Sequence, residues 1–479
     1  REKLYVSYPK ADAGGAELRP AFIVARLQTL FPGLAVENAS LARLCTAPKS
    51  ALPLAGEKGG KALRAYFDAA GIYDDALRAM DRAAQVKRGK LSPGAVELLY
   101  GRRFRMSASR MDKLRQCHYA YFLQYGLKAK KRSESVFDSM EAGTFLHYIL
   151  ENVGRETMRL GGFAAVEDEK LRELTRQYAE RFAKEQLFGD RQQSARFRYL
   201  FRRTVKSAQE IILDLAGELR CSDFKPLAFE LSFGNTNEDE LPAITVQEGE
   251  NTLQLNGKVD RVDGWIHEGK LYLRVMDYKT GKKKFDLADV RYGLNLQMLL
   301  YLFALEEQGE SLFDKPIVPA GVLYMPAREE LLSMDRASSD EQIRNSMASK
   351  LRRSGLMLDD KAVLAAMEHP DEKGKTKYIP LSSHALGSIA SAEQIGILSR
   401  HVTQQMRDIT REMAAGIIDA DPCCHNEQNT ACAFCEFETI CHFENGVGGD
   451  RLRYIRPAGN LDDYWEGLRR ATEEGGGEV

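Results

Sequence analysis

The sequence predicts an α/β protein in which a mixed central sheet is flanked by helices. Apolar residues recur at helical spacing over residues 138–153, and charged amphipathic helices are expected over 165–220. Strand-like segments follow near residues 227–233, 253–262 and 271–279. A mainly apolar helix is then expected over residues 294–306. Helices on both sides of a run of strands indicate a sheet that is covered by helices.

The segments before and after this region are expected to be mixed or helical. Residues 1–100 suggest a short strand at 4–7 and helices over 21–30 and near 62–85. Apolar residues at helical spacing predict one helix from Ser107 to Gly126, which carries Cys117. The two remaining stretches are a largely helical, polar segment at 329–398 and a glycine-rich C-terminal tail.

Composition is that of an ordinary soluble protein. The chain has 479 residues, of which 44% are hydrophobic and 29% charged, so two or three domains are expected. No apolar run reaches the roughly 18 residues of a membrane span. Eight cysteines in so long a chain do not indicate a secreted disulfide scaffold, and we expect a cytoplasmic protein. Because the chain begins with Arg1, we expect a fragment of a longer polypeptide.

The net charge neither supports nor excludes nucleic-acid binding, because it is only -1. Any DNA contact must therefore depend on local basic segments, and the candidates are residues 102–105, 128–132 and 282–284. Such runs are more often solvated surface. Residues 55–61 are glycine-rich but lack the spacing of a phosphate-binding loop, so no ATP hydrolysis is expected from this chain.

Carboxylates and a lysine gather at the ends of two predicted strands. Side chains alternate along a strand, so Asp277 and Lys279 are expected on the same face, and Asp260 comes from the preceding strand. Two neighbouring carboxylates suit Mg²⁺, which prefers oxygen ligands. The metal would stabilise the charge that develops in phosphodiester hydrolysis and activate a water that the lysine positions. An exposed ion pair between Asp277 and Lys279 explains the spacing equally well.

Four ordered motifs resemble those of the RecB-type PD-(D/E)XK nucleases. They are GTFLH at 143–147, GKVD at 257–260, DYKTG at 277–281 and QMLLY at 297–301. The resemblance implies a restriction-endonuclease-like core. It also implies that Mg²⁺ is held by His147, Asp260, Asp277 and the backbone carbonyl of Tyr278, and that Lys279 is catalytic. A lone helical histidine is usually structural, but the accompanying motifs favour metal ligation by His147.

Three further residues are candidates for a supporting role. Gln297 and Tyr301 are four residues apart and share a helix face. They could contact DNA or brace the site, and core packing explains them nearly as well. Glu230 lies on a predicted strand in a position suited to an additional metal contact.

The cysteines near the C-terminus indicate a second metal centre. Cys432, Cys435 and Cys441 form a C-x₂-C-x₅-C pattern, which points to a soft metal or a cluster with one ligand missing. Cys117 is one candidate for the fourth ligand, although a free cysteine is usually a buried apolar residue. The competing candidates are Cys423 and Cys424, and, for a zinc site, His425 and His442. Spacing alone does not choose between them.

One cysteine before the nuclease motifs and three after them resembles the iron-sulfur nucleases typified by AddB, over about residues 107–458. That family implies a [4Fe-4S] cluster on Cys117, Cys432, Cys435 and Cys441, which staples the nuclease domain. Residues 1–100 would be the remnant of a degenerate helicase-like region, and 459–479 a C-terminal tail. Crosslinking two distant segments favours stability rather than catalysis.

The resemblance also implies an activity and a partner. The domain would cleave the 5′-terminated strand while an AddA helicase-nuclease subunit unwinds DNA, in double-strand break processing and recombinational repair. The alternative is a catalytically inert DNA-binding or scaffold subunit that is stapled by an iron-sulfur or zinc site. Asp260, Asp277 and Lys279 are all present, which argues against an inert descendant.

Overall fold

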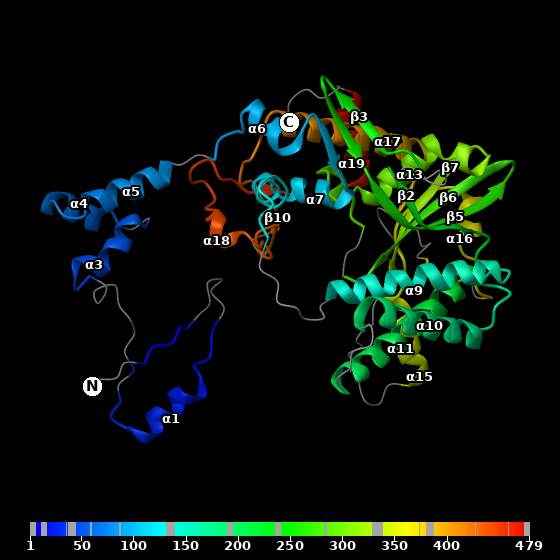
Figure 1. Ribbon diagram of the computed structural model, residues 1–479, viewed down its shortest axis with the longest axis horizontal. Helices are drawn as coiled ribbons and strands as arrows, with labels where there is room; N and C mark the ends of the chain where they lie inside the picture. Colours follow the sequence, from blue (N-terminus) through cyan, green and yellow to red (C-terminus); the bar gives the residue numbers. More distant parts are fainter. Residues whose placement is uncertain are drawn as a thin grey trace. The chain divides into compact units, whose positions relative to one another are not determined.

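The chain forms two compact units, Arg1–Val86 and Lys87–Val479. The computed structural model (Figure 1) describes residues 6–10, 17–34, 36, 45–57, 60–85, 88–130, 139–188, 195–234, 241–281, 285–327, 339–372, 374–379, 388–426, 428–457 and 459–473. Within these ranges, no helix combines the length and the apolar character needed to cross a bilayer.

The first unit contains the expected helices α1 (Phe22–Leu30), α4 (Lys61–Ala70) and α5 (Asp74–Gln85). Its small core includes Phe67, which is fully buried, and Leu77. Of the strand expected at 4–7, Val6 and Ser7 are not in a strand, and residues 4 and 5 lie outside the described residues. Helix α6 (Pro93–Tyr100) packs Val96 into the core of the second unit, so the unit boundary lies before residue 100.

A six-stranded mixed sheet forms the centre of the second unit, and this confirms the predicted fold class. Its order is β2-β5-β6-β7-β8-β9. The strands are β2 (Lys225–Phe233), β5 (Gly257–His267), β6 (Lys270–Lys279), β7 (Ile317–Pro326), β8 (Ser354–Leu358) and β9 (Ile389–Ala390). The pairs β6/β7 and β8/β9 are parallel, and the other pairs are antiparallel.

Helices cover this sheet (Figure 1). Those that precede it in sequence are α9 (Ser139–Arg159), α10 (Asp168–Phe182) and α11 (Ala195–Arg220). Buried residues of α11 recur at helical spacing: Ala208, Ile211, Ile212, Leu215, Ala216 and Leu219. Helix α13 (Gln297–Gln308) packs on β6, β7 and α17 (Ala392–Ala414), and residues 298–305 are buried on every side. That position explains the apolar run noted in the sequence.

The strand expected at 253–262 is two strands in two sheets. β4 (Asn251–Leu255) pairs with β1 (Arg103–Met106) and β3 (Ile244–Glu248), whereas β5 begins at Gly257. The chain changes sheets at Asn256, whose amide donates to the carbonyl of Met106. The sequence pattern did not show this change of sheet, because apolar residues occur in both strands: β4 buries alternate residues, whereas residues 259–264 of β5 are all buried.

The helix expected from Ser107 to Gly126 is broken at Cys117. Ser107 caps α7 (Ala108–Gln116), and α8 (His118–Tyr121) and a π-helical turn (Phe122–Gly126) follow. Cys117 is extended, with φ −170° and ψ 123°. The amide of His118 donates to Oδ1 of Asp421 at 3.0 Å, so a side chain replaces the helical carbonyl acceptor at this point.

The region expected to be largely helical at 329–398 also supplies β8 and β9, alongside α15 (Asp340–Lys350) and α16 (Lys361–Met367). Farther on, β10 (Cys423–Asn426), β11 (Asn429–Thr430) and α18 (Glu438–Cys441) surround the cysteine motif. Within the expected tail, α19 (Leu461–Glu473) buries Tyr464, Trp465 and Leu468 in the core. The final glycines lie outside the described residues.

Candidate active site

Asp260 and Asp277 lie side by side on neighbouring strands. Arg261 of β5 pairs with Met276 of β6 in an antiparallel register. Asp260, just before Arg261, therefore lies opposite Asp277, just after Met276. Both residues are buried. The amide of Tyr278 donates a 2.7 Å hydrogen bond to Oδ2 of Asp260, which fixes this carboxylate across the two strands.

Lys279 contacts Asp277, as their shared face predicts. Its Nζ lies 2.5 Å from Oδ2 of Asp277 and 5.2 Å from the centre of the Tyr324 ring. The side chains of Asp277 and Lys279 are only 7% and 21% exposed, unlike the exposed ion pair that was the alternative. Burial and the neighbouring charge of Asp260 raise the pKa of Asp277 to about 6, against the opposing effect of Lys279.

His147 and Glu230 complete the cluster. Nδ1 of His147, on α9, lies 3.3 Å from Oδ1 of Asp260 and 3.6 Å from Oε1 of Glu230, on β2. Burial alone would lower the pKa of His147, but the nearby carboxylates of Asp260 and Glu230 raise it to about 10. Burial likewise works against ionisation of Glu230, whose pKa is nevertheless lowered by His147 and Lys258.

Helix α9, which carries His147, approaches β2 closely because Gly154 has no side chain. A Cβ there would lie 2.5 Å from the Phe229 ring.

These residues fit a divalent cation. One ligand atom from each of His147, Glu230 and Asp260 lies within 4.8 Å of the others, the one such group among the described residues. Among the described residues, Oε1 of Glu230 is buried with no hydrogen-bond partner, and a hard cation would satisfy such an oxygen, whereas Oδ2 of Asp277 is paired with Lys279. Glu230 also has φ of 54° within a strand, a strained conformation of the kind that concentrates at functional sites.

Tyr301 is buried, whereas Gln297, one turn before it on α13, is half-buried. Tyr301 is 3% exposed, and its ring stacks on Phe233 with centres 5.4 Å apart. Burial raises the pKa of Tyr301 to about 12, while its hydrogen bonds to Gln297 and to the backbone of Lys258 oppose that rise. A Cβ on Gly257 would lie 2.1 Å from the Tyr301 hydroxyl, so the motif glycine makes room for this tyrosine. Tyr301 therefore braces β5.

The four expected cluster ligands line one cavity of about 250 Å³. Cys117 reaches it from the break between α7 and α8, and Cys441 from the end of α18. Cys432 and Cys435 reach it from the loop between β11 and α18, where the amide of Cys435 donates to the carbonyl of Cys432 at 3.0 Å. The structure thus brings together thiols that are far apart in the sequence.

The competing ligands divide between this cavity and other contacts. Cys423 and Cys424 are buried on β10 and do not line the cavity, and the thiol of Cys424 donates to the carbonyl of Asn426. His425 forms an ion pair with Asp289 at 3.3 Å. His442 does line the cavity. Of the competing candidates, His442 is therefore the one that lines the cavity together with the four cysteines.

The four thiols influence one another but are not tightly grouped. Burial and the neighbouring thiols of Cys117, Cys435 and Cys441 raise the pKa of Cys432 to about 12. Among the described residues, no three of these sulfur atoms lie within 4.8 Å of one another. Ligands about 2.3 Å from a single tetrahedral zinc would be closer together than that. The thiols therefore line a common cavity without meeting at one point.

Arg88 was not anticipated from the sequence, and it holds the cysteine loop, defined as residues 432–450. Its guanidinium donates to both carboxylate oxygens of Asp450, at 2.9 and 2.8 Å, and to the carbonyl of Cys441 at 2.8 Å. It also lies over the Tyr119 ring, 4.2 Å from its centre. A single arginine hundreds of residues before its partners carries no sequence signal for such contacts.

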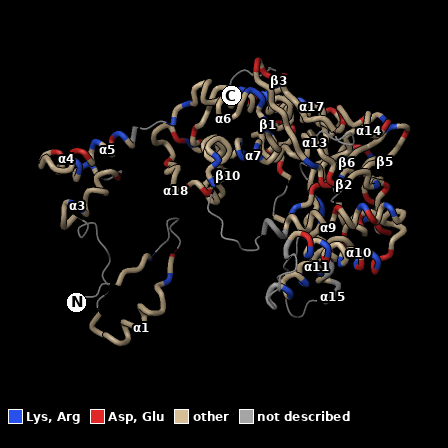
Figure 2. The backbone as a smooth tube through the Cα atoms, in the orientation of Figure 1, with Lys and Arg blue, Asp and Glu red and all other residues tan. Residues whose placement is uncertain are grey.

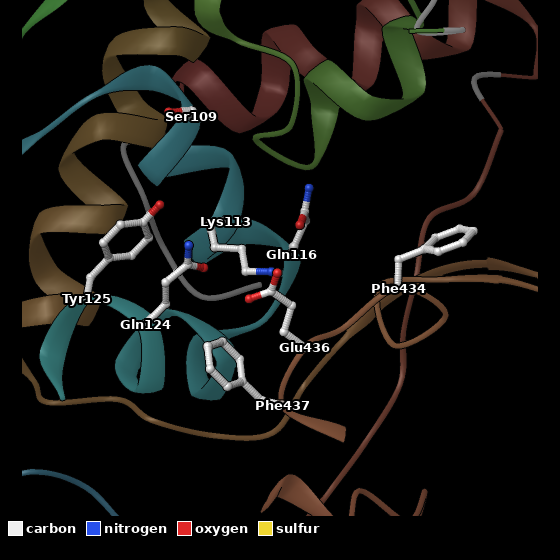
Figure 3. A pocket seen from close by; sticks show the side chains of 8 residues that line it. All are labelled: Ser109, Lys113, Gln116, Gln124, Tyr125, Phe434, Glu436 and Phe437. Carbon is white, nitrogen blue, oxygen red and sulfur yellow. The ribbon is translucent and has the colours of Figure 1, made fainter. Parts of the chain in front are cut away.

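A second, polar cavity of about 240 Å³ adjoins the cysteines. Figure 3 shows its walls, formed by α7, the π-helical turn and the cysteine loop, with Lys113 and Glu436 pointing toward one another. Phe434 on the cysteine loop is 97% exposed. Tyr125 lies under the guanidinium of Arg110, 4.9 Å from its ring centre.

The expected basic segments are only partly described. Arg102, Arg103 and Arg105 are exposed, and Arg102 forms ion pairs with Glu97 and Glu250. Of residues 128–132, Lys128 and Lys130 are described and exposed, and 282–284 lie outside the described residues. Basic and acidic residues are interspersed along the backbone (Figure 2), in keeping with the net charge.

Comparison with known proteins identifies relatives of this chain. Residues 105–442 match the family model of the PD-(D/E)XK nuclease superfamily. The chain is 29% identical over 511 residues to the B-type subunit of an ATP-dependent helicase/deoxyribonuclease of Clostridium perfringens strain ATCC 13124. It is 30% identical over 524 residues to the protein of the same name from Caldanaerobacter subterraneus subsp. tengcongensis. Both alignments cover 100% of this chain and 43% of the relative, so the chain spans less than half the length of these relatives.

Proposed function

The chain belongs to the PD-(D/E)XK nuclease superfamily, and we propose that it is the Mg²⁺-dependent deoxyribonuclease part of a helicase-nuclease subunit. One observation carries the proposal. Asp260, Asp277 and Lys279 converge at the end of two paired strands, next to His147 and a buried oxygen of Glu230 that has no hydrogen bond. This arrangement suits metal-dependent cleavage of a phosphodiester.

In this proposal the metal ligands are His147, Asp260, Asp277 and the carbonyl of Tyr278, with Glu230 as an added ligand. Bound there, the cation would neutralise phosphate charge and lower the pKa of water. Lys279 would orient the attacking water. Its ammonium is held by Asp277 and lies near the Tyr324 ring, which limits its movement. Tyr301 would keep β5 in place behind the carboxylates.

We further propose that Cys117, Cys432, Cys435 and Cys441 hold a [4Fe-4S] cluster. Their common cavity supports a shared metal centre, and the resemblance of their spacing in the sequence to that of the iron-sulfur nucleases favours a cluster over a single zinc ion. A cluster would join the start of the nuclease region to its C-terminal loop and so stabilise the fold.

The substrate and partner are proposed from the relatives, whose name describes one subunit of an ATP-dependent helicase/deoxyribonuclease. We propose DNA as the substrate, the 5′-terminated strand as the strand that is cut, and an AddA helicase-nuclease subunit as the partner in recombinational repair. The exposed ring of Phe434 beside Lys113 is a suitable surface for single-stranded DNA, because bases stack on aromatic rings and phosphates pair with lysines. The alternative is an inert scaffold.

A nuclease assay tests this proposal. The chain is incubated with end-labelled single-stranded DNA in Mg²⁺ or in EDTA, beside Asp277→Asn, which keeps the side-chain size but removes the charge. We expect cleavage by the wild-type chain in Mg²⁺ alone. DNA binding without cleavage, both for the isolated chain and in the presence of the partner subunit, would support the scaffold instead.

A further inference from the structure

Lys258 is a second lysine at the proposed active site, at its mouth rather than inside it. It lies on β5 two residues before Asp260, so the two side chains share a face of the strand. Its Nζ is 3.1 Å from Oε2 of Glu230. The Lys258 side chain is 53% exposed, whereas the Glu230 side chain is 10% exposed. The ammonium therefore sits between solvent and a buried carboxylate.

The two oxygens of Glu230 face different partners. Oε2 contacts Lys258, while Oε1 is buried without a hydrogen bond, 3.6 Å from Nδ1 of His147. Oε1 belongs to the side where Glu230, His147 and Asp260 converge within 4.8 Å. Because a carboxylate shares its charge between its two oxygens, a divalent cation at Oε1 would weaken the attraction between Oε2 and the ammonium of Lys258. The dication is favoured, because it carries twice the charge and would lie in the more buried position.

Each carboxylate of this site has a partner within the chain when no cation is bound. Asp277 has Lys279, Asp260 accepts from the amide of Tyr278, and Glu230 has Lys258. Lys279, 21% exposed, lies inside the site even if the cation also binds Asp277. Lys258 is the lysine that would lose its partner when a cation takes Glu230, and it is exposed at the entrance. Its long stem would let the ammonium turn outward.

We propose that Lys258 is a metal-gated phosphate-binding residue, held by Glu230 in the metal-free site and released to the DNA backbone when a divalent cation binds Glu230. This inference rests on the proposed nuclease function. The ligand is the phosphodiester backbone of the strand that enters the site. Lys258 would thus make strong DNA binding depend on a bound divalent cation.

The first test measures DNA affinity against salt concentration. All proteins carry Lys279→Ala to prevent cleavage, and fluorescence anisotropy follows a labelled single-stranded oligonucleotide in Mg²⁺ or in EDTA. In Mg²⁺, Lys258→Gln should reduce the slope of log affinity against log salt by about 0.7, the value for one phosphate contact on a single strand. In EDTA the slopes with and without Lys258→Gln should agree, because Glu230 already holds the ammonium. Lys258→Arg should keep the Mg²⁺ slope.

The second test measures metal affinity without DNA, by calorimetric titration with Mn²⁺. Removing the competing ammonium should tighten Mn²⁺ binding by about two- to fivefold, the scale of one half-exposed ion pair. The control is Lys270→Gln, which changes an exposed lysine at the other end of the hairpin. Weaker DNA binding together with tighter metal binding separates gating from a damaged fold, since damage would weaken both.

Three results would overturn the proposal: an unchanged slope in Mg²⁺, an equal loss of slope in EDTA, or weaker Mn²⁺ binding by Lys258→Gln. Cleavage by the chain with Lys279 intact tests the underlying function separately. If that chain cleaves DNA and Lys258→Gln keeps the full slope, only the role of Lys258 is wrong. If it does not cleave, either alone or with the partner subunit, the proposed function fails whatever the slopes show.

Discussion

Oδ2 of Asp260 accepts a 2.7 Å hydrogen bond from the backbone amide of Tyr278, the residue that follows Asp277 on the neighbouring strand. The hydrogen bond leaves Oδ1 of Asp260 directed at His147, 3.3 Å from Nδ1. One carboxylate is thus positioned by the sheet itself and offers its second oxygen to the proposed metal. Small changes at this position should affect catalysis more than folding.

Asp260→Asn should reduce cleavage by about a hundredfold or more, because the amide loses the charge that a hard cation requires. It keeps the shape and an oxygen acceptor for the Tyr278 amide, so the melting temperature should change little. Initial rates on single-stranded DNA and circular dichroism provide the measurements. Asp359→Asn, at an exposed position, is the control and should cleave normally. Full activity of Asp260→Asn would remove Asp260 from the site.

His147→Ala should weaken metal affinity rather than abolish the reaction, since the carboxylates of Glu230, Asp260 and Asp277 remain. We expect the Mg²⁺ concentration for half-maximal cleavage to rise about 10- to 100-fold, with partial recovery at high Mg²⁺ or Mn²⁺. Rate measurements over a range of metal concentrations test this. A rate that falls equally at every metal concentration would give His147 a purely structural role.

The sequence predicted the central helices and strands because their periodic or continuous apolar patterns are local information, even where a strand such as β6 is buried on both faces. It placed Asp277 and Lys279 together for the same reason, since alternation along β6 is local information. Glu230 was only a weak candidate, because its approach to His147 depends on a left-handed backbone conformation that propensity does not predict.

The errors arose where a distant segment overrode the local pattern. The helix through Cys117 breaks because the side chain of Asp421 takes the amide of His118, a contact across hundreds of residues. The strand expected at 253–262 splits because β4 pairs with β1 while β5 joins the central sheet. Lys258 was not among the predicted site residues. It lies two residues before Asp260 on a strand, and this spacing predicts that the two side chains share a face.

Cys117→Ala should prevent assembly of the proposed cluster, because an incomplete ligand set binds metal weakly. The purified variant should lose visible absorbance and bound iron, and the melting temperature should fall. Cys424→Ala is a matched control, because Cys424 is also buried but does not line the cavity, and it should retain its iron. If Cys424→Ala lost iron and Cys117→Ala kept it, the ligand assignment would be reversed.

Arg88→Gln should shorten the lifetime of the cluster without preventing its assembly. The substitution removes the ion pair with Asp450 and the donor to the carbonyl of Cys441, and both residues belong to the cysteine loop. Decay of visible absorbance in air should be faster than in the wild-type chain, whereas iron content after anaerobic purification should be equal. Arg78→Gln changes an exposed ion pair of the first unit and serves as the control. Equal decay rates in all three proteins would show that Arg88 does not protect the cluster.

A buried ion network beneath the active-site strands should make the nuclease region sensitive to acid. Glu218 of α11 lies 2.8 Å from Arg274 and 2.8 Å from Arg353, and these three side chains are fully buried. Burial alone would raise the pKa of Glu218, but Arg353, Arg274 and Arg261 lower it from 4.5 to about 2. Such a depressed pKa stabilises the fold fully above the unfolded value, and the contribution is lost as pH falls from about 4.5 toward 2.

Glu218→Gln should therefore lower the free energy of unfolding by about 3–5 kcal/mol at pH 7, because it leaves buried arginines without their shared counter-charge. The loss should shrink as the pH is lowered below about 4.5, since protonation increasingly removes the same charge from the wild-type chain. Urea unfolding between pH 7 and pH 3 measures both effects. Glu210→Gln changes a 58% exposed residue of the same helix, paired with Arg172, and should cost less than about 1 kcal/mol at every pH. Equal stabilities of Glu218→Gln and Glu210→Gln at pH 7 would show that the buried network does not stabilise the fold through Glu218.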